Sequence, residues 1–310
     1  MKFKSAGVIL YFNLLVEIFR KCRQKLFRFA SCSNSEYRTR NPNSLLSDSQ
    51  RTPYEETVVL LTQSPSRFKT FRRNPNYREI LEHVGVRLGD LYLEKIKYYD
   101  EDLRVSLPIL KSLGNVGKPF RYFFKEVGLA SPTALRYLST GLEITHCFHE
   151  KDTRRIAEIG MGFGGLGQVL NKLIKVDNID FFDLPSVMNL SERYLEESES
   201  DLNFTFQEID NYGVSNLDLC ISNYAFSELP KSLQLTYLSK VCQKSSCGYL
   251  IMNSGLGDST YRNSGKLSIL EILDFLPTAQ VYEEIPNSGP DNYLILWGHT
   301  LEPYRALRLR

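Results

Sequence analysis

A glycine-rich turn in the middle of the chain constrains the fold more than any other feature. The stretch from Arg154 to Leu170 reads RRIAEIGMGFGGLGQVL and places five glycines within eight positions. A short apolar run precedes the glycines, and a pattern typical of an amphipathic helix follows them. A strand, a glycine turn and a helix in this order aim backbone N–H groups and a helix N-terminus at one point. The turn therefore predicts an α/β fold that binds a nucleotide-like ligand at a strand end.

The same alternation continues to the C-terminus. Short apolar runs such as NIDFFD, NLDLCISN, GYLIMN and NYLILWG alternate with helical stretches such as PSVMNLSERYLEE. Strands that alternate with helices indicate βαβ units and a sheet covered on both faces. We expect a Rossmann-like, doubly wound sheet of about seven strands, with the last two paired antiparallel.

The first half of the chain has a different texture. Residues 30–53 are rich in Ser, Asn, Arg and Pro, which is typical of a flexible linker. Residues 54–150 have a helical pattern without strand alternation, and Ser131 followed by Pro132 marks a helix start. The sequence thus predicts four parts: an amphipathic helix over 1–29, a linker over 30–53, a helical region over 54–150 and the α/β domain over 151–310.

The first 29 residues, MKFKSAGVILYFNLLVEIFRKCRQKLFRF, carry an apolar run from Ala6 to Phe19 that Asn13 and Glu17 interrupt. The run is shorter than the roughly 20 residues that span a bilayer. Glu17 and the lack of a small-residue cleavage site disfavour a signal peptide. Two interpretations stay open: peripheral contact of residues 6–29 with a membrane surface, and docking on this protein's own surface or on a partner subunit.

Charge and cysteine content narrow the class of protein. Lys and Arg total 38 against 36 Asp and Glu, a net charge of +2, so nucleic acid is a poor candidate partner. Six cysteines are scattered without a C-x-x-C pair, which predicts neither a zinc site nor a disulfide framework. We expect a cytoplasmic protein, with membrane association left open and the oligomeric state undetermined.

Two nucleotide-like ligands fit the glycine turn. Gly160 to Gly165 satisfies the G-x-G-x-x-G pattern of dinucleotide sites, and also the G-x-G-x-G pattern behind an acid that S-adenosylmethionine-dependent methyltransferases carry. Asp183, at the end of the next apolar run, suits the ribose hydroxyls of either ligand. Glu158 discriminates between them, because its charge repels a pyrophosphate and attracts the methionyl ammonium group. About 145 residues follow Gly165, which leaves no second domain for a nicotinamide substrate. S-Adenosylmethionine is therefore the favoured cofactor over NAD.

Four segments give the chain a family resemblance: EIGMGFGGLGQVL, FFDLPSV, CISNYAFSEL and SGPDNYLILWG, in this order. They resemble the sugar O-methyltransferase family of class I S-adenosylmethionine-dependent enzymes, and the likeness covers roughly residues 70–300. Met161 departs from the glycine that the family usually has there. The resemblance implies that Gly160, Gly162 and Gly164 line the methionine and ribose, that Asp183 binds the ribose and that Leu184 flanks the adenine. Asp210 is a candidate for the adenine amino group, or else an ordinary turn carboxylate.

Methyl transfer to a hydroxyl needs in-line positioning and a group that accepts the proton. Glu228 is our candidate base, because related O-methyltransferases place a catalytic His near this position; a helix-capping carboxylate is the alternative. Asn223 and Tyr224 are candidates to orient substrate hydroxyls, although Tyr224 also suits a packed aromatic. His146 and His149 are rival bases, or structural residues at a helix end.

No ligand spacing for a metal stands out, so we expect a metal-independent enzyme that methylates a small-molecule or glycan-type hydroxyl. Two other functions stay open: an NAD-dependent oxidoreductase, and a catalytically silent interaction protein that keeps the methyltransferase fold.

Overall fold

The computed structural model describes residues 47, 50, 53–151, 153–214, 216–253, 265–289 and 291–309. The helix predicted over 1–29 lies outside these residues, as does most of the linker predicted over 30–53. Within the described ranges, none of the helices combines the length and apolarity that crossing a bilayer requires.

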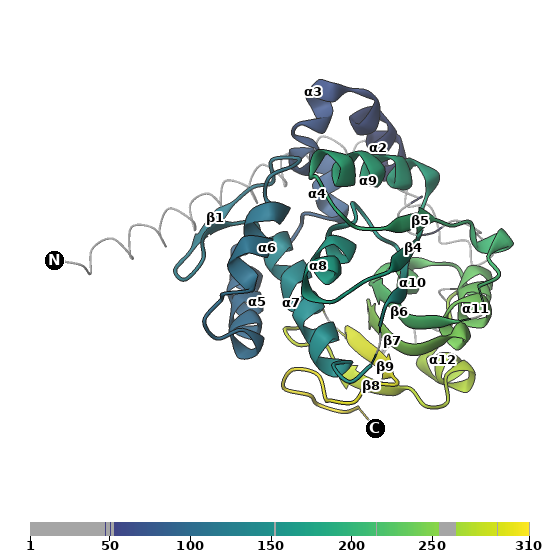
Figure 1. Cartoon of the computed structure of the whole chain (residues 1–310). Helices are drawn as coiled ribbons and strands as arrows, with labels where there is room; N and C mark the ends of the chain where they lie inside the picture. Colours follow the sequence, from purple (N-terminus) through teal and green to yellow (C-terminus); the bar gives the residue numbers. More distant parts are fainter. Residues whose placement is uncertain are drawn as a thin grey trace.

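A seven-stranded sheet forms the centre of the molecule, in the order β5-β4-β3-β6-β7-β9-β8 (Figure 1). Its strands are β3 (Arg155–Ile159), β4 (Asn178–Phe182), β5 (Phe204–Phe206), β6 (Leu217–Asn223), β7 (Ser245–Met252), β8 (Gln280–Glu283) and β9 (Tyr293–Trp297). The first five are parallel, and β9 runs antiparallel to both β7 and β8. The predicted Rossmann-like, doubly wound sheet of seven strands is confirmed, including the antiparallel pairing of its last two strands.

Both faces of the sheet are buried, because the central strands are apolar on both sides. In β3, Ile156 belongs to one hydrophobic cluster and the adjacent Ala157 to the other. One face carries α8 (Gly165–Leu173) and α9 (Pro185–Glu197); the other carries α10 (Ala225–Glu228), α11 (Lys231–Lys240) and α12 (Ile269–Phe275). Two short 3-10 turns, η3 (Ile209–Asn211) and η4 (Cys242–Lys244), complete this half of the chain.

The helices before the sheet share the core of one of its faces. They are α2 (Tyr54–Gln63), α3 (Pro65–Phe68), η2 (Phe71–Arg73), α4 (Pro75–Ile80), α5 (Val86–Tyr99), α6 (Ser106–Leu113) and α7 (Pro132–Cys147). Helix α7 packs between α5 and α8, and α2 packs against α9 (Figure 1). One continuous hydrophobic cluster runs from Tyr54 in α2 to Leu296 in β9. The helical region therefore has no core separate from that of the sheet.

Two local features of this region bear on the sequence predictions. The start of α7 is confirmed, since the Ser131 hydroxyl accepts a bond from the Ala134 amide at 3.4 Å and Pro132 occupies the first helical position. A hairpin of β1 (Tyr122–Phe124) and β2 (Gly128–Ala130) stands where no strand was expected. Each of its strands has only three residues, which is too short to give a readable alternation.

Candidate functional site

Two adjoining cavities lie where the strand order reverses, between β3 and β6. We call them the Arg136 cavity, of about 340 Å³, and the Asp210 cavity, of about 480 Å³. Open α/β sheets bind ligands at the carboxyl ends of the strands at such a reversal. Four residues line both cavities: Gly160, Asp183, Ala225 and Glu228. The two cavities therefore meet over the end of β3 and the start of α10.

The glycine turn forms the floor of this junction. Gly160 has φ +77°, and a Cβ atom added there would stand 1.9 Å from the Cβ of Ala225. Only glycine allows both this backbone angle and this approach of α10. Met161 is 1% exposed and packs in the hydrophobic cluster. Gly162 lines the Arg136 cavity, whereas Gly164 caps the start of α8 and lines neither cavity.

Asp183 lies directly after β4, at the boundary of the two cavities. Its carboxylate accepts bonds from the amides of Gly162, at 3.1 Å, and Leu184, at 2.8 Å. Burial raises the pKa of Asp183 to about 6, and these backbone donors oppose the rise. Each carboxylate oxygen accepts more than one bond, so Asp183 can still receive hydroxyl donors from a ligand. Leu184 and Asp210 line the Asp210 cavity beside it, and Asp210 is exposed.

Glu158 is the most deeply buried acid on the cavity walls, with 1% of its surface exposed. Burial, and then the charge of Asp183, raise the pKa of Glu158 well above its usual range. Its Oε2 atom has no hydrogen-bond partner in the described part of the chain, and neither has Oδ1 of Asn223 at the end of β6. Buried oxygens are rarely left unpaired without a reason such as an absent ligand or water. Both atoms belong to residues that line the Arg136 cavity.

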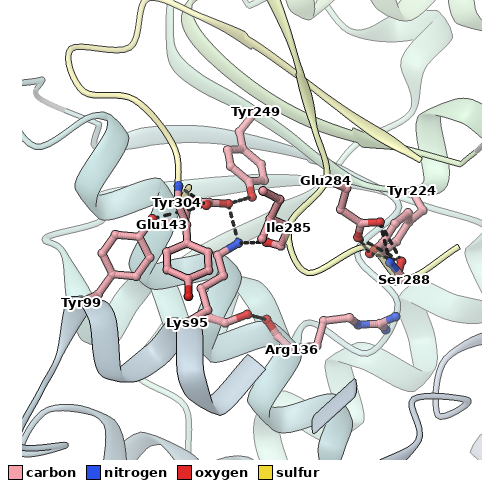
Figure 2. Close-up of polar contacts among 11 residues, drawn as sticks. Lys95, Tyr99, Arg136, Glu143, Tyr224, Tyr249, Glu284, Ile285, Ser288 and Tyr304 are labelled. Atoms are coloured by element: carbon pink, nitrogen blue, oxygen red, sulfur yellow. Dashed lines mark hydrogen bonds and ion pairs between the residues drawn. The ribbon is translucent and has the colours of Figure 1, made fainter. Parts of the chain in front are cut away.

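Tyr224 forms a wall of the same cavity in an unusual conformation. Its φ of +75° is a left-handed angle that costs a non-glycine residue about 1–3 kcal/mol. Its hydroxyl bonds to Glu284 and lies 3.0 Å from the Ser288 hydroxyl, while Asn292 donates to Glu284 at 3.0 Å. The connection between β8 and β9 therefore fixes the position of Tyr224 (Figure 2). Tyr224 thus lines the cavity with its hydroxyl already bonded to this connection.

Glu228 stands at the end of α10 and lines both cavities. Asn253, at the end of β7, donates a bond to its Oε1 atom at 3.2 Å. Glu228 lies in the first turn of α10, and Pro230, the N-cap residue of α11, makes no side-chain capping bond. Glu228 is half-buried at the point where the two cavities meet.

The two histidines proposed as rival bases are not brought to either cavity. His146 packs against the ring of Tyr99 at 5.0 Å, and Nδ1 of His149 lies 3.3 Å from the Thr300 hydroxyl. Tyr137, which does line the Arg136 cavity, lies nine residues before His146, about 13 Å along α7. The length of the helix separates these histidines from the site.

His83 and Arg136 line the Arg136 cavity and were not found from the sequence. Nδ1 of His83 lies 2.9 Å from the carbonyl oxygen of Ile80, so it donates to this oxygen. Arg136 is 4% exposed, and its guanidinium lies 5.5 Å and 5.7 Å from the ring centres of Tyr137 and Tyr224. The only sequence signal for His83 was its presence among four histidines in the whole chain.

Acids, cysteines and histidines do not gather into a group of three or more that could hold a metal ion within the described ranges.

Comparison with known proteins gives structural neighbours only. No protein-family model and no curated protein matches the sequence. The mitomycin 7-O-methyltransferase MmcR is 11% identical with a TM-score of 0.39, over 52% of this chain and 53% of the enzyme, about half its length. A methyltransferase from Clostridium acetobutylicum is 11% identical, with a TM-score of 0.40, over 53% of this chain and 92% of its own. The plantazolicin methyltransferase BpumL, in complex with SAH, is 13% identical with a TM-score of 0.39, over 68% of this chain and 96% of its own. At these identities the similarity concerns the fold.

Proposed function

We propose that the protein is an S-adenosylmethionine-dependent O-methyltransferase. The observation that carries this proposal is the unpaired Oε2 of Glu158 beside the glycine turn, in a cavity that also holds Asp183. A buried carboxylate oxygen without a partner suits an ammonium group, and a pyrophosphate at the same place would be repelled. This preference argues against an NAD-dependent oxidoreductase.

The two cavities match the two ends of such a donor. The Asp210 cavity, with Leu184 and Asp210 on its walls, suits the adenosine, and Asp183 at the boundary suits the ribose hydroxyls. Glu158 and the turn from Gly160 to Gly162 suit the methionine end. When bound, the donor supplies a methyl group attached to a positively charged sulfur.

Glu228 is the base that we propose for the acceptor hydroxyl. It stands where the two cavities meet, and its bond from Asn253 holds one carboxylate oxygen in place. A sugar hydroxyl is a weak nucleophile at neutral pH, and a positioned carboxylate can accept its proton as the methyl group transfers.

His83 is a second candidate base, favoured by its hydrogen bond. Because the carbonyl of Ile80 only accepts, Nδ1 of His83 carries the proton, and in the neutral ring Nε2 then carries the lone pair. A histidine that acts as the base must present an unprotonated ring nitrogen to the acceptor hydroxyl, and in this tautomer that nitrogen is Nε2.

A hydroxyl-bearing acceptor of the sugar or glycan class suits the remaining walls of the Arg136 cavity. Asn223, Asn253, Ser288 and Asn292 line it, and their side chains both donate and accept hydrogen bonds. A hydroxyl group has the same double capacity. We propose a metal-independent reaction, in which one of the two bases accepts the proton.

Isothermal titration with S-adenosylhomocysteine, and with NAD as the comparison, tests the donor. We expect micromolar binding of the former, none of the latter, and loss of binding in Asp183→Ala but not in the exposed control Asp201→Ala. Binding of NAD alone contradicts the proposal, and binding of neither supports a catalytically silent interaction protein.

Transfer of a labelled methyl group to a panel of neutral and acidic sugars tests the base. We expect Glu228→Gln to lower kcat by at least a hundredfold while the affinity for S-adenosylhomocysteine stays unchanged. A large loss in His83→Gln, with full activity in Glu228→Gln, assigns the base to His83 instead.

A further inference from the structure

Three basic side chains are less than a tenth exposed within the described ranges: Arg72, Lys95 and Arg136. Arg72 forms an ion pair with Glu82, and Lys95 forms one with Glu143 at 2.7 Å. Arg136 has no carboxylate within ion-pair distance among the described residues. Buried charges are normally paired, because an uncompensated charge is costly in the protein interior. Arg136 is therefore the exception that needs an explanation.

The protein contacts of Arg136 leave its hydrogen-bonding capacity unused. Its Nη2 atom donates to the carbonyl of Leu81 at 3.4 Å, a long bond, and its Nε atom has no partner in the part of the chain that the structure describes. The rings of Tyr137 and Tyr224 lie near the outer limit at which a cation and an aromatic ring attract each other. These contacts hold the guanidinium in place without neutralising it.

The side chain of Arg136 forms part of the wall of a cavity. Figure 2 shows its side chain extending toward Tyr224 and Ser288, away from the polar network around Glu143. It lines the Arg136 cavity together with these two residues. A guanidinium presents two parallel N–H donors that match the two oxygens of a carboxylate, or two oxygens of a phosphate.

We propose that Arg136 binds an oxyanion, a carboxylate or phosphate, on the ligand that fills this cavity. The inference rests on the proposed function, which supplies two sources for such a group. One is the amino-acid carboxylate of S-adenosylmethionine; the other is an acidic group on the acceptor, as in a uronic acid or a sugar phosphate. In either case the anion of the ligand completes the ion pair that the protein leaves open.

The test compares Arg136→Met, which removes the charge, with Arg136→Lys, which keeps it. The first probes are S-adenosylhomocysteine and 5′-methylthioadenosine, which lacks the amino-acid end, and both are titrated by calorimetry. Thermal unfolding checks that each variant is folded, and Arg136→Gln replaces Arg136→Met if the latter is not. If the donor supplies the anion, the neutral variant loses at least tenfold in affinity for S-adenosylhomocysteine and none for 5′-methylthioadenosine. Arg136→Lys then recovers part of the loss.

If the affinity for S-adenosylhomocysteine is unchanged, galacturonate, galactose 6-phosphate and galactose are titrated into the protein saturated with it. Binding of an acidic sugar to the wild type, lost in the neutral variant, places the anion on the acceptor. Unchanged affinity for all these probes overturns the assignment of Arg136 while leaving the proposed function intact. A wild type that binds neither S-adenosylhomocysteine nor an acidic sugar overturns both.

Discussion

Helix α7 carries two buried charged residues with opposite surroundings. Glu143 accepts bonds from Lys95 at 2.7 Å, from Tyr99 at 3.3 Å, from the backbone amide of Tyr304 at 2.9 Å and from the hydroxyl of Tyr249 (Figure 2). Arg136, two turns earlier on the same side of the helix, has one long bond to a carbonyl. The protein itself supplies the hydrogen-bond partners of Glu143, whereas Arg136 lines a cavity. We call the surroundings of Glu143 the closed network and those of Arg136 the open region.

The difference separates two uses of a buried charge. A network in which every group has a partner stabilises and rigidifies the fold, and it leaves a ligand nothing to bind. A buried charge that faces a cavity with unpaired atoms costs the ligand-free protein free energy, which a complementary ligand recovers. Three residues that line the Arg136 cavity each carry a buried side-chain atom without a hydrogen-bond partner in the described part of the chain: Nε of Arg136, Oε2 of Glu158 and Oδ1 of Asn223.

The largest effect is expected on breaking the closed network. Glu143→Gln leaves Lys95 buried without its counter-charge, and we expect a loss of about 3–5 kcal/mol in the free energy of unfolding. Arg136→Met, which removes a charge that already lacks a partner, is expected to change this free energy by less than about 1 kcal/mol. Urea denaturation of both variants measures the contrast, and equal losses would show that Arg136 is as structural as Glu143.

The next effect concerns the open region. Asp183→Asn replaces a carboxylate that we expect to accept two ribose hydroxyls. Bonds to a charged group contribute about 1.5–3 kcal/mol each, so we expect the affinity for S-adenosylhomocysteine to fall about a hundredfold or more. Calorimetric titration checks this, with Asp201→Asn as the exposed control. A loss below threefold would remove Asp183 from the donor site.

Glu158→Gln is expected to separate stability from binding. Burial disfavours the ionised form of Glu158 and the neutral amide avoids this cost, so the melting temperature of the ligand-free protein stays the same or rises. The attraction for an ammonium group is lost, and the affinity for S-adenosylhomocysteine falls about tenfold. A lower melting temperature with unchanged affinity would place Glu158 among the structural acids, beside Glu143.

The smallest effect is a dependence on pH. The pKa of Asp183 is raised from 3.8 to about 6, so its carboxylate takes up a proton as the pH falls through this value. We expect the affinity for S-adenosylhomocysteine to drop about fivefold between pH 7 and 5.4 in the wild type, because less of Asp183 is ionised. Asp183→Asn is expected to lose this component of the pH dependence.

Stability is expected to move in the opposite direction over the same range. Since the folded protein binds this proton more tightly than the unfolded chain does, Asp183 adds to the stability of the ligand-free protein as the pH falls from about 6 toward 3.8. Unfolding measured at several pH values, in the wild type and in Asp183→Asn, isolates this contribution. If the contribution of Asp183 to the free energy of unfolding instead decreases as the pH falls, the fold stabilises the ionised carboxylate, and the pKa of Asp183 is lowered rather than raised.

The parts of the site that could be predicted from the sequence are those set by local order along the chain. Glu158 is the last residue but one of the strand before the glycine turn, and Asp183 follows the next strand, so parallel pairing of β3 and β4 brings them together. Glu228 follows β6 in the same way and reaches the same edge of the sheet.

The remaining walls depend on tertiary packing, which no local pattern records. Arg136 lies within a helix, and the sequence pattern does not distinguish a buried arginine there from an exposed one. His83 lies between α4 and α5, and Glu284 lies between β8 and β9, so both reach the site from segments distant in the sequence. His146 and His149 were predicted as bases from their residue type alone. The length of α7 holds both of them away from the cavities.

Helix α7 also limits how this site can change during evolution. Its residues Arg136 and Tyr137 line the cavity, while its opposite surfaces pack into the core against α5 and α8. Acceptor-binding segments that sit on exposed loops can be exchanged between related proteins with little cost to folding. Here the cavity wall and the core belong to one buried helix, so a substitution that alters ligand preference also alters the packing of the sheet. New specificities are therefore expected to arise through the connection between β8 and β9, which contributes Ser288 and Asn292 without carrying the main core.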